Sequence, residues 1–269
     1  MTPVELSMFQ IDAFTDRVFS GNPAAVCPLD TWIPDDAMQA IAAENNLAET
    51  AFFASAEDGR GANGDSYDLR WFTPTVEVEL CGHATLATAF LIFERFNRHA
   101  ETLQFQTRSG VLSVARQDGK LFLDFPSYPG TTVDGPAALA AGLGAAPVEV
   151  IEGPNYMAVF ETEADIAALA PKLELLATLH PRGVIATAPG DAVDFVSRYF
   201  APSFGVPEDS VTGSAHCMLT PYWAKRLGRN KMNARQISAR GGALVCEDRG
   251  DRVGIGGQAV MYLEGKITV

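Results

Sequence analysis

The chain has 269 residues, 47% of them hydrophobic and 20% charged, so it holds enough apolar side chains for a sizeable core, and disorder is excluded as its main state. Its 33 Asp and Glu outnumber 20 Lys and Arg, and a net charge of −13 without a basic cluster argues against nucleic acid and anionic membranes as partners. The first residues lack the basic and long apolar regions of a secretory signal, and no apolar stretch approaches the roughly 20 residues of a membrane span, so we expect a cytoplasmic protein.

Strands predominate among the elements predicted in the first third of the chain. An acidic first turn followed by apolar residues at Met38, Ile41 and Ala42 predicts an amphipathic helix over 34–47. Strand-like apolar runs lie on both sides of this helix, and a Gly-rich stretch around 59–64 predicts a loop. The predicted strands are 8–15, 22–29, 51–54 and 67–72.

The segment 103–125 alternates apolar and polar residues, and Asp118-Gly119 within it predicts a hairpin turn. The Pro-rich FPSYPG at 125–130 indicates a crossover into a second half. Near the end, GIGGQA at 254–259 fits the G-x-G-x-x-A dinucleotide pattern, but that pattern requires a following helix. Since 260–269 predicts a strand, we interpret GIGGQA as a glycine-rich bend.

An internal repeat relates the two halves. RWFTP at 70–74 corresponds to RYFAP at 198–202, and both spell R-aromatic-F-x-P. An acidic stretch and then a small turn follow each copy, Gly82-His83-Ala84 in the first half and Gly213-Ser214-Ala215 in the second. The repeat predicts that the chain contains two similar domains.

Each small turn leads into a predicted helix, 84–96 in the first half and 215–227 in the second. Both segments are apolar nearly all round, which is typical of a buried helix. Pro221 lies inside the second segment and is expected to kink or shorten that helix. The prediction is therefore two halves, each a strongly bent sheet wrapped around one central helix.

A glycine-led turn at the start of a helix presents free backbone N–H groups and the positive end of the helix dipole, which suits a carboxylate. Taken alone, Gly82 and Gly213 are equally compatible with tight turns that bind nothing. Glu49, His83 and Asp209 lie near these turns or in a neighbouring motif. Carboxylates and an imidazole beside an anion site are suited to proton transfer at a carbon next to a carboxyl group.

The environment of Glu49 is apolar, with Leu47, Ala51 and Phe52 close in sequence. We expect burial to raise the pKa of Glu49 towards a value useful for catalysis. The structural alternatives are a solvated carboxylate at a helix end for Glu49, a turn-bonding histidine for His83 and a capping residue for Asp209.

Four ordered motifs are similar to those of a known family. FTDRVFSGNPAAV, NLAETAFF, LRWFTPTVEVELCGHATLATAF and VPEDSVTGSAHCMLTPYW resemble the PhzF-like isomerase family of the diaminopimelate epimerase fold, over a stretch from about residue 8 to about 242. The resemblance implies an α+β fold of two pseudo-symmetric domains, each with a barrel-like, mostly antiparallel sheet around a central helix, and a site in the cleft between them. We assign 1–127 with the C-terminal strand 258–269 to the first domain and 128–257 to the second.

The resemblance also implies the site. Glu49 matches the family's proton-shuttling glutamate, and His83 and Asp209 match its two assisting residues, so these three are the expected catalytic residues. The expected substrate-binding residues are Gly82, Thr212, Gly213 and Ser214. The resemblance implies no cofactor and no metal, a small carboxylate-containing substrate such as the dihydro-hydroxyanthranilate of phenazine synthesis, and a homodimer.

One departure concerns the thiols. Amino-acid epimerases and racemases of this fold use two thiols, each directly before the glycine of a turn. Cys81 precedes Gly82, but Thr212 precedes Gly213. A two-thiol racemase is therefore disfavoured, and we interpret Cys81 as a small buried residue.

Two further alternatives involve the same residue types. Four scattered cysteines without a CxxC motif indicate reduced thiols, and zinc binding by Cys81, His83 and the His216-Cys217 pair is disfavoured because adjacent helix residues point about 100° apart. A protein that binds a small carboxylate without converting it stays an alternative. A buried Glu49 beside the bound anion would distinguish the isomerase from such a protein.

Overall fold

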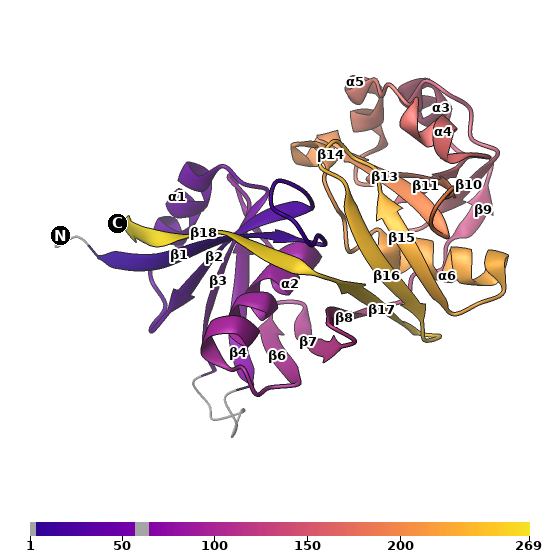
Figure 1. Cartoon of the computed structure of the whole chain (residues 1–269). Helices are drawn as coiled ribbons and strands as arrows, with labels where there is room; N and C mark the ends of the chain where they lie inside the picture. Colours follow the sequence, from indigo (N-terminus) through magenta and orange to yellow (C-terminus); the bar gives the residue numbers. More distant parts are fainter. Residues whose placement is uncertain (1–3, 57–64) are drawn as a thin grey trace. The chain divides into compact units, whose positions relative to one another are not determined.

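A computed structural model describes residues 4–56 and 65–269. The chain divides into two compact units, Met1–Asp124 with Gly256–Val269 and Phe125–Ile255. We refer to these as unit 1 and unit 2 (Figure 1). The loop predicted around 59–64 lies outside the described residues.

Unit 1 is a mixed, mostly antiparallel sheet whose strands pair in the order β18-β1-β2-β3-β4-β6-β7-β8. Among the neighbouring strands in this order, the pairs β2–β3 and β4–β6 are parallel. The strands are β1 (Glu5–Ala13), β2 (Asn22–Leu29), β3 (Glu49–Ser55), β4 (Ser66–Phe72), β5 (Glu77–Val78), β6 (Thr102–Thr107), β7 (Gly110–Gln117), β8 (Lys120–Pro126) and β18 (Ala259–Thr268). Figure 1 shows the yellow β18 beside the indigo β1, so the C-terminal strand completes the N-terminal unit.

The helices of unit 1 are α1 (Asp35–Asn45), α2 (Gly82–Leu91) and a π-helical turn, Ile92–Phe96, that continues α2. All residues of α2 except Phe90 are buried, and the helix contacts β1, β2 and β3. Its two threonines, Thr85 and Thr88, donate their hydroxyl hydrogens to the carbonyl oxygens four residues earlier. A helix without a solvent face therefore leaves neither hydroxyl unsatisfied. The central helix predicted over 84–96 is confirmed and is almost wholly buried as far as Phe93, whereas 94–96, in the π-helical turn, are exposed.

Unit 2 has the same architecture, with strands in the order β9-β10-β11-β12-β13-β15-β16 and parallel pairs at β11–β12 and β13–β15. The strands are β9 (Thr131–Val133), β10 (Glu149–Glu152), β11 (Tyr156–Val159), β12 (Val184–Pro189), β13 (Phe195–Ala201), β14 (Val206–Asp209), β15 (Lys231–Gln236), β16 (Gly242–Asp248) and β17 (Arg252–Gly257). The helices are α3 (Ala137–Leu143), α4 (Glu163–Ala167), α5 (Leu173–Leu176) and α6 (His216–Leu227), with 3-10 turns at Ala177–Leu179 and Pro202–Phe204.

The strand pairings confirm the predicted duplication. From β1 to β7 and from β10 to β16, antiparallel and parallel pairs alternate in the same sequence, and β5 and β14 add a short strand at the same place. The central helices α2 and α6 then follow these short strands. The α+β fold with two pseudo-symmetric halves is the one expected from the sequence.

The repeated R-aromatic-F-x-P motif has the same structural role in each unit. Arg70 on β4 donates from Nε and Nη2 to the two carboxylate oxygens of Glu77 on β5, at 2.8 and 2.9 Å. Arg198 on β13 donates in the same way to Glu208 on β14, at 2.7 and 2.9 Å. Each guanidinium also lies over the phenylalanine two residues later in its motif. The motif therefore fixes the short strand that leads to the helix turn.

Of the two effects expected of Pro221, a kink or a shorter helix, the shortening does not occur, because α6 continues to Leu227. A proline lacks the N–H that would bond the carbonyl oxygen four residues earlier, here that of Cys217. The backbone N–H of Tyr128 donates to this oxygen at 2.9 Å instead. The carbonyl group therefore stays satisfied although the helix lacks one of its own hydrogen bonds.

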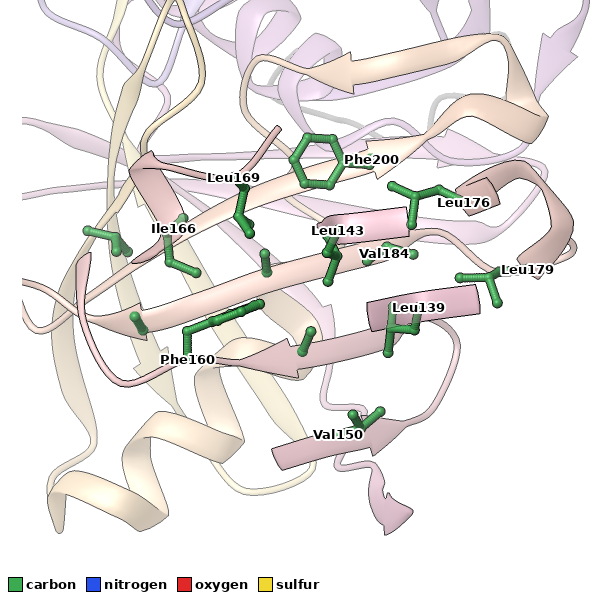
Figure 2. Packing of buried hydrophobic residues seen from close by; sticks show 14 residues of the cluster. Leu139, Leu143, Val150, Phe160, Ile166, Leu169, Leu176, Leu179, Val184 and Phe200 are labelled. Atoms are coloured by element: carbon green, nitrogen blue, oxygen red, sulfur yellow. The ribbon is translucent and has the colours of Figure 1, made fainter. Parts of the chain in front are cut away.

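Unit 2 has a hydrophobic core formed by the helices α3 to α5 against the strands (Figure 2). Figure 2 shows Leu139 and Leu143 projecting from α3 towards the sheet. The residues labelled there are Leu139, Leu143, Val150, Phe160, Ile166, Leu169, Leu176, Leu179, Val184 and Phe200. Each is less than 9% exposed. Burial of one large apolar side chain contributes about 1.5–3 kcal/mol to the free energy of folding, so this core is a major source of the stability of unit 2.

One of the two turns predicted from glycines is confirmed. Asp118 and Gly119 join β7 to β8 with φ values of 50° and 72°, as a two-residue hairpin turn requires. The bend predicted for GIGGQA is wrong, because its glycines lie within the strand β17, although a strand and not a helix follows as expected. A Cβ at Gly257 would lie 2.4 Å from the ring of Phe14, so close packing accounts for this glycine. Among the described residues, no helix has the length and hydropathy needed to span a membrane.

Candidate active site

Glu49 is placed by the turn between α1 and β3. α1 ends at Asn45, and Asn46 takes a left-handed conformation with φ 48°, a conformation that asparagine tolerates better than most residues. The side chain of Asn45 donates to the hydroxyl of buried Thr50 at 3.1 Å. Glu49 then begins β3 in register with Ala24 of β2. The NNLAET motif is therefore a helix stop followed by a strand start.

His83 lies at the start of α2 and faces Glu49. Its Nε2 is 3.1 Å from Oε2 of Glu49, while the side chains are only 5% and 18% exposed. These two atoms are buried, and among the described residues neither has a well-directed hydrogen bond, because their contact is close but poorly aligned. A carboxylate oxygen and an imidazole nitrogen are therefore held together, out of bulk water, with bonding capacity to spare.

The pKa of Glu49 departs from the expected direction. Burial raises it, as predicted, but the nearby His83 and Cys81 lower it further than burial raises it, so the net pKa lies below the usual value. The expectation of a raised pKa was wrong because His83 lies 34 residues away in sequence and 3.1 Å away in space. Glu49 is consequently ionised at neutral pH.

Cys81 and His83 are coupled to this carboxylate. Burial and the charge of Glu49 raise the pKa of the Cys81 thiol to about 11. Burial lowers the pKa of His83, but the charges of Cys81 and Glu49 outweigh it and raise that pKa. Cys81 is uncharged below pH about 11, so its contribution is absent at neutral pH. Glu49 is then the group that favours a second proton on His83, and burial opposes that proton.

The set Glu49, Cys81 and His83 is, among the described residues, a group whose ligand atoms lie within 4.8 Å of one another, close enough for a metal ion. Carboxylate, thiolate and imidazole are ligands that zinc uses. Glu49 faces Nε2 of His83, and the Sγ atom of Cys81 lies 3.5 Å from Nδ1. A carboxylate in contact with a buried imidazole is also an arrangement suited to proton transfer.

The second turn, in unit 2, is organised by Asp209 and Gln236. The hydroxyl of Thr212 donates to Oδ2 of Asp209 at 2.6 Å. Gln236, only 1% exposed, accepts from the backbone N–H of Thr212 at 2.9 Å and donates to the backbone oxygen of Asp209 at 2.8 Å. Gly213 is buried and Ser214 exposed. Thr212 and Asp209 therefore form one hydrogen-bonded unit before α6.

The two turns correspond residue by residue. Thr85 in α2 donates to the backbone oxygen of Cys81, and His216 in α6 places Nδ1 2.8 Å from the backbone oxygen of Thr212. Both contacts join a side chain to the carbonyl four residues earlier, directly before the glycine of the turn. His216 is thus the counterpart of Thr85 and stabilises its turn.

Of the predicted catalytic residues, Glu49 and His83 lie in contact in unit 1, while Asp209 lies in unit 2 with Thr212. Sequence reasoning missed two buried amides that bond these groups, Asn22 at His83 and Gln236 at the second turn. Both are polar residues at the end of an otherwise apolar or alternating strand, NPAAVCPL and KMNARQ. This pattern in the sequence could have indicated both residues, because a buried polar side chain requires a hydrogen-bond partner.

Comparisons with known proteins show which family the chain resembles. The family model "Phenazine biosynthesis-like protein" (PhzC-PhzF) matches residues 11–265. An uncharacterized isomerase of Pseudomonas aeruginosa is 51% identical over 264 residues, covering 98% of this chain and 99% of the relative. The crystal structure of a PhzF-family protein from Enterococcus faecalis superposes with a TM-score of 0.93 at 43% identity, covering 98% and 99% of the two chains.

A more distant structure shares the fold. A hydroxyproline epimerase from Agrobacterium vitis has a TM-score of 0.62 at 11% identity, covering 100% of this chain and 92% of the epimerase. At this identity the likeness shows the fold alone, and it is the epimerase-like fold described above. With the family motifs placed on Glu49, His83 and the second turn, the match over almost the whole sequence shows that the chain belongs to the phenazine biosynthesis-like PhzC/PhzF family.

Proposed function

We propose that this protein is an isomerase that moves a proton within a small carboxylate-containing metabolite, with Glu49 as the acid/base group. The family and the isomerase name of its relative support the reaction class. The observation that carries the mechanism is the buried contact of Glu49 Oε2 with His83 Nε2, 3.1 Å apart and poorly aligned with each other.

Glu49 begins the reaction as a base. Its lowered pKa keeps the carboxylate ionised at neutral pH, so it removes a proton from a carbon that the neighbouring carboxyl group of the substrate activates. The proton then resides on the carboxyl group of Glu49, which returns it to a different atom of the same substrate. The C–H bond that breaks is replaced by a new bond to hydrogen, so the reaction needs no oxidant or reductant.

Positive potential for the substrate carboxylate comes from the first turn. Gly82 is the first residue of α2, and its backbone N–H and those of the next residues lack partners within the helix. The absence of a side chain at Gly82 lets an anion approach this helix end, where the helix dipole stabilises negative charge. We assign this role to Gly82 because the turn also carries His83.

The proposal extends to the second turn as an assisting group. The Thr212 hydroxyl donates to Asp209, which fixes that carboxylate, while Gly213 and Ser214 offer backbone N–H groups and a hydroxyl ahead of α6. Replacement of Asp209 by Asn should lower turnover of the same substrate on which Glu49 acts. Unchanged turnover in Asp209→Asn would remove the second turn from the proposal.

Two other functions are weaker. A two-thiol racemase requires a second cysteine where Thr212 lies, and the Cys81 thiol stays protonated up to a pH of about 11. A binding protein without turnover has no need for an ionised carboxylate buried beside an imidazole, since burying a charge costs free energy unless that charge is used or paired.

The experiment is NMR in D₂O with dihydro-hydroxyanthranilate and a panel of cyclic and amino-acid carboxylates. Deuterium incorporation and new isomers are followed for the wild type and for Glu49→Gln, while calorimetry measures binding of the same compounds. Turnover by the wild type that is lost in Glu49→Gln with binding retained supports the isomerase. Binding without turnover by both proteins supports the binding protein, and turnover that survives the substitution excludes Glu49 as the acid/base group.

A further inference from the structure

Asn22 contacts the ring of His83. It is the first residue of β2, only 1% exposed, and its Nδ2 atom is 3.1 Å from Nδ1 of His83. The preceding Gly21 has φ 67°, and a Cβ there would lie 2.2 Å from the backbone oxygen of Ala13. A glycine is thus required for the chain to enter β2 at the position that presents Asn22.

The contact has a chemical direction. An amide nitrogen carries two hydrogens and donates them, whereas an imidazole nitrogen accepts only when it carries no hydrogen. With Nδ2 of Asn22 facing it, Nδ1 of His83 must be the accepting nitrogen. The ring hydrogen then lies on Nε2, the atom 3.1 Å from Glu49. The other neighbour of Nδ1, the Cys81 thiol at 3.5 Å, also has a hydrogen to donate.

The protein contains an internal contrast. Nδ1 of His216 lies 2.8 Å from the backbone oxygen of Thr212. A carbonyl oxygen only accepts, so this Nδ1 carries the hydrogen. Burial lowers the pKa of His216 to about 4, so the ring is neutral at pH 7 and its Nε2 carries no hydrogen. The two buried histidines are therefore held as opposite tautomers by their partners at Nδ1.

We propose that Asn22 is a positioning residue that holds His83 as the neutral imidazole with its hydrogen on Nε2. The charge of Glu49 favours a second ring proton and acts to raise the pKa of His83. Against this, an imidazolium would direct Nδ1–H at the hydrogens of the Asn22 amide. Those hydrogens oppose the second proton. The groups that face the ring are the Glu49 carboxylate, the Cys81 thiol and the Asn22 amide.

This tautomer assigns separate tasks to the two residues of the site. This consequence rests on the proposed function. In that reaction, His83 donates a hydrogen bond from Nε2 to a substrate oxygen on which negative charge develops. It does not take the substrate proton itself, so Glu49 is the sole base. The tautomer can be measured without any substrate.

The test is long-range ¹H–¹⁵N NMR of the full-length protein labelled with ¹⁵N-histidine. The chain has four histidines, and His99 and His180 are exposed, so His99→Gln and His180→Gln identify their signals and leave the two buried rings. The result expected at pH 7 is an unprotonated Nδ1 and a protonated Nε2 for His83, and the reverse for His216. A protonated Nδ1 on His83, in either a reversed or a doubly protonated ring, would overturn the proposal.

Asn22→Asp provides the matched variant, because it replaces the donating amide with a carboxylate of the same shape that only accepts. We expect the Nδ1 signal of His83 to become protonated, while the His216 signals stay unchanged and report an intact fold. An unchanged His83 ring in folded Asn22→Asp would remove Asn22 as the cause. If this variant does not fold, the wild-type spectrum alone decides the tautomer. Because the NMR test of the His83 tautomer uses no substrate, its failure can be distinguished from a failure of the deuterium-exchange experiment, which tests Glu49.

Discussion

At the scale of single residues, the site depends on one pair whose members lie far apart in sequence. The motifs NNLAET and CGHAT predict Glu49 and His83 as candidates, but only the structure shows their 3.1 Å contact. The direction of the pKa of Glu49 could not be predicted because it depends on that distance. Asn22 lies at the end of an apolar strand, which is a signal for a buried polar contact, but its partner His83 is 61 residues away in sequence and could not be identified.

The pair makes a prediction about stability and pH. The pKa of Glu49 in the folded protein is lower than its ordinary value of 4.5, so the carboxylate stabilises the fold above pH 4.5 and this contribution is lost as the pH falls through the folded pKa. Compared with Glu49→Gln, the wild type should gain in free energy of unfolding between acid and neutral pH. Urea denaturation at pH 3 to 7 measures this difference, and a difference that grows towards acid pH would contradict the assignment.

A second prediction at this scale concerns Cys81. Its thiol is buried and has a pKa of about 11, so it is neither a nucleophile nor a proton acceptor at neutral pH. Cys81→Ser should therefore keep deuterium exchange within about tenfold of the wild type, less than the 10²–10⁴ typical of a lost acid/base group. A loss as large as that of Glu49→Gln would instead favour a thiol mechanism.

At the scale of elements, the repeated sequence motif joins two neighbouring strands in each unit. The R-aromatic-F-x-P motif predicted a duplication, and its physical basis is a bidentate arginine–glutamate pair from β4 to β5 and from β13 to β14. Helices and strands followed from periodicity, whereas the continuation of α6 through Pro221 did not. The compensating N–H comes from Tyr128 in a distant segment, and no local pattern contains it.

The pair in unit 2 can be tested by Arg198→Lys. Arg198 is 13% exposed in its side chain and Glu208 26%, and lysine keeps the charge but loses the two parallel hydrogen bonds. We expect the free energy of unfolding to fall by about 1–3 kcal/mol. The matched control is Arg95→Lys, whose pair with Glu264 is about half exposed and should lose less than about 1 kcal/mol. Equal losses in both variants would show that the bidentate geometry does not matter.

At the scale of the whole molecule, each unit has its own sheet and central helix, and the chain returns to unit 1 at its end. β18 pairs with β1 along Glu5–Ala13, which places the last strand of the sequence in the first unit. The homodimer that the family resemblance implies stays a prediction. The two-domain organisation was accessible from the sequence because duplicated motifs mark equivalent places, which single strands do not.

This topology predicts a local effect of shortening the chain. Removal of 259–269 deprives β1 of one partner strand and opens the edge of the unit 1 sheet. Backbone amides of β1 should then exchange hydrogen much faster, while those in the core strands β12 and β13 of unit 2 keep their protection. Hydrogen exchange read by mass spectrometry checks this. Equal loss of protection in both units would mean that the units unfold together.

The central claim is that the Glu49 carboxylate carries the proton. The most direct measurement is the rate of deuterium incorporation into a substrate in D₂O by the wild type, by Glu49→Gln and by Glu44→Gln, which makes the same change at an exposed position of α1. We predict that Glu49→Gln lowers the rate by about 10²–10⁴-fold and that Glu44→Gln leaves it unchanged. A Glu49→Gln protein that is folded, binds the substrate and exchanges at the wild-type rate would contradict the account.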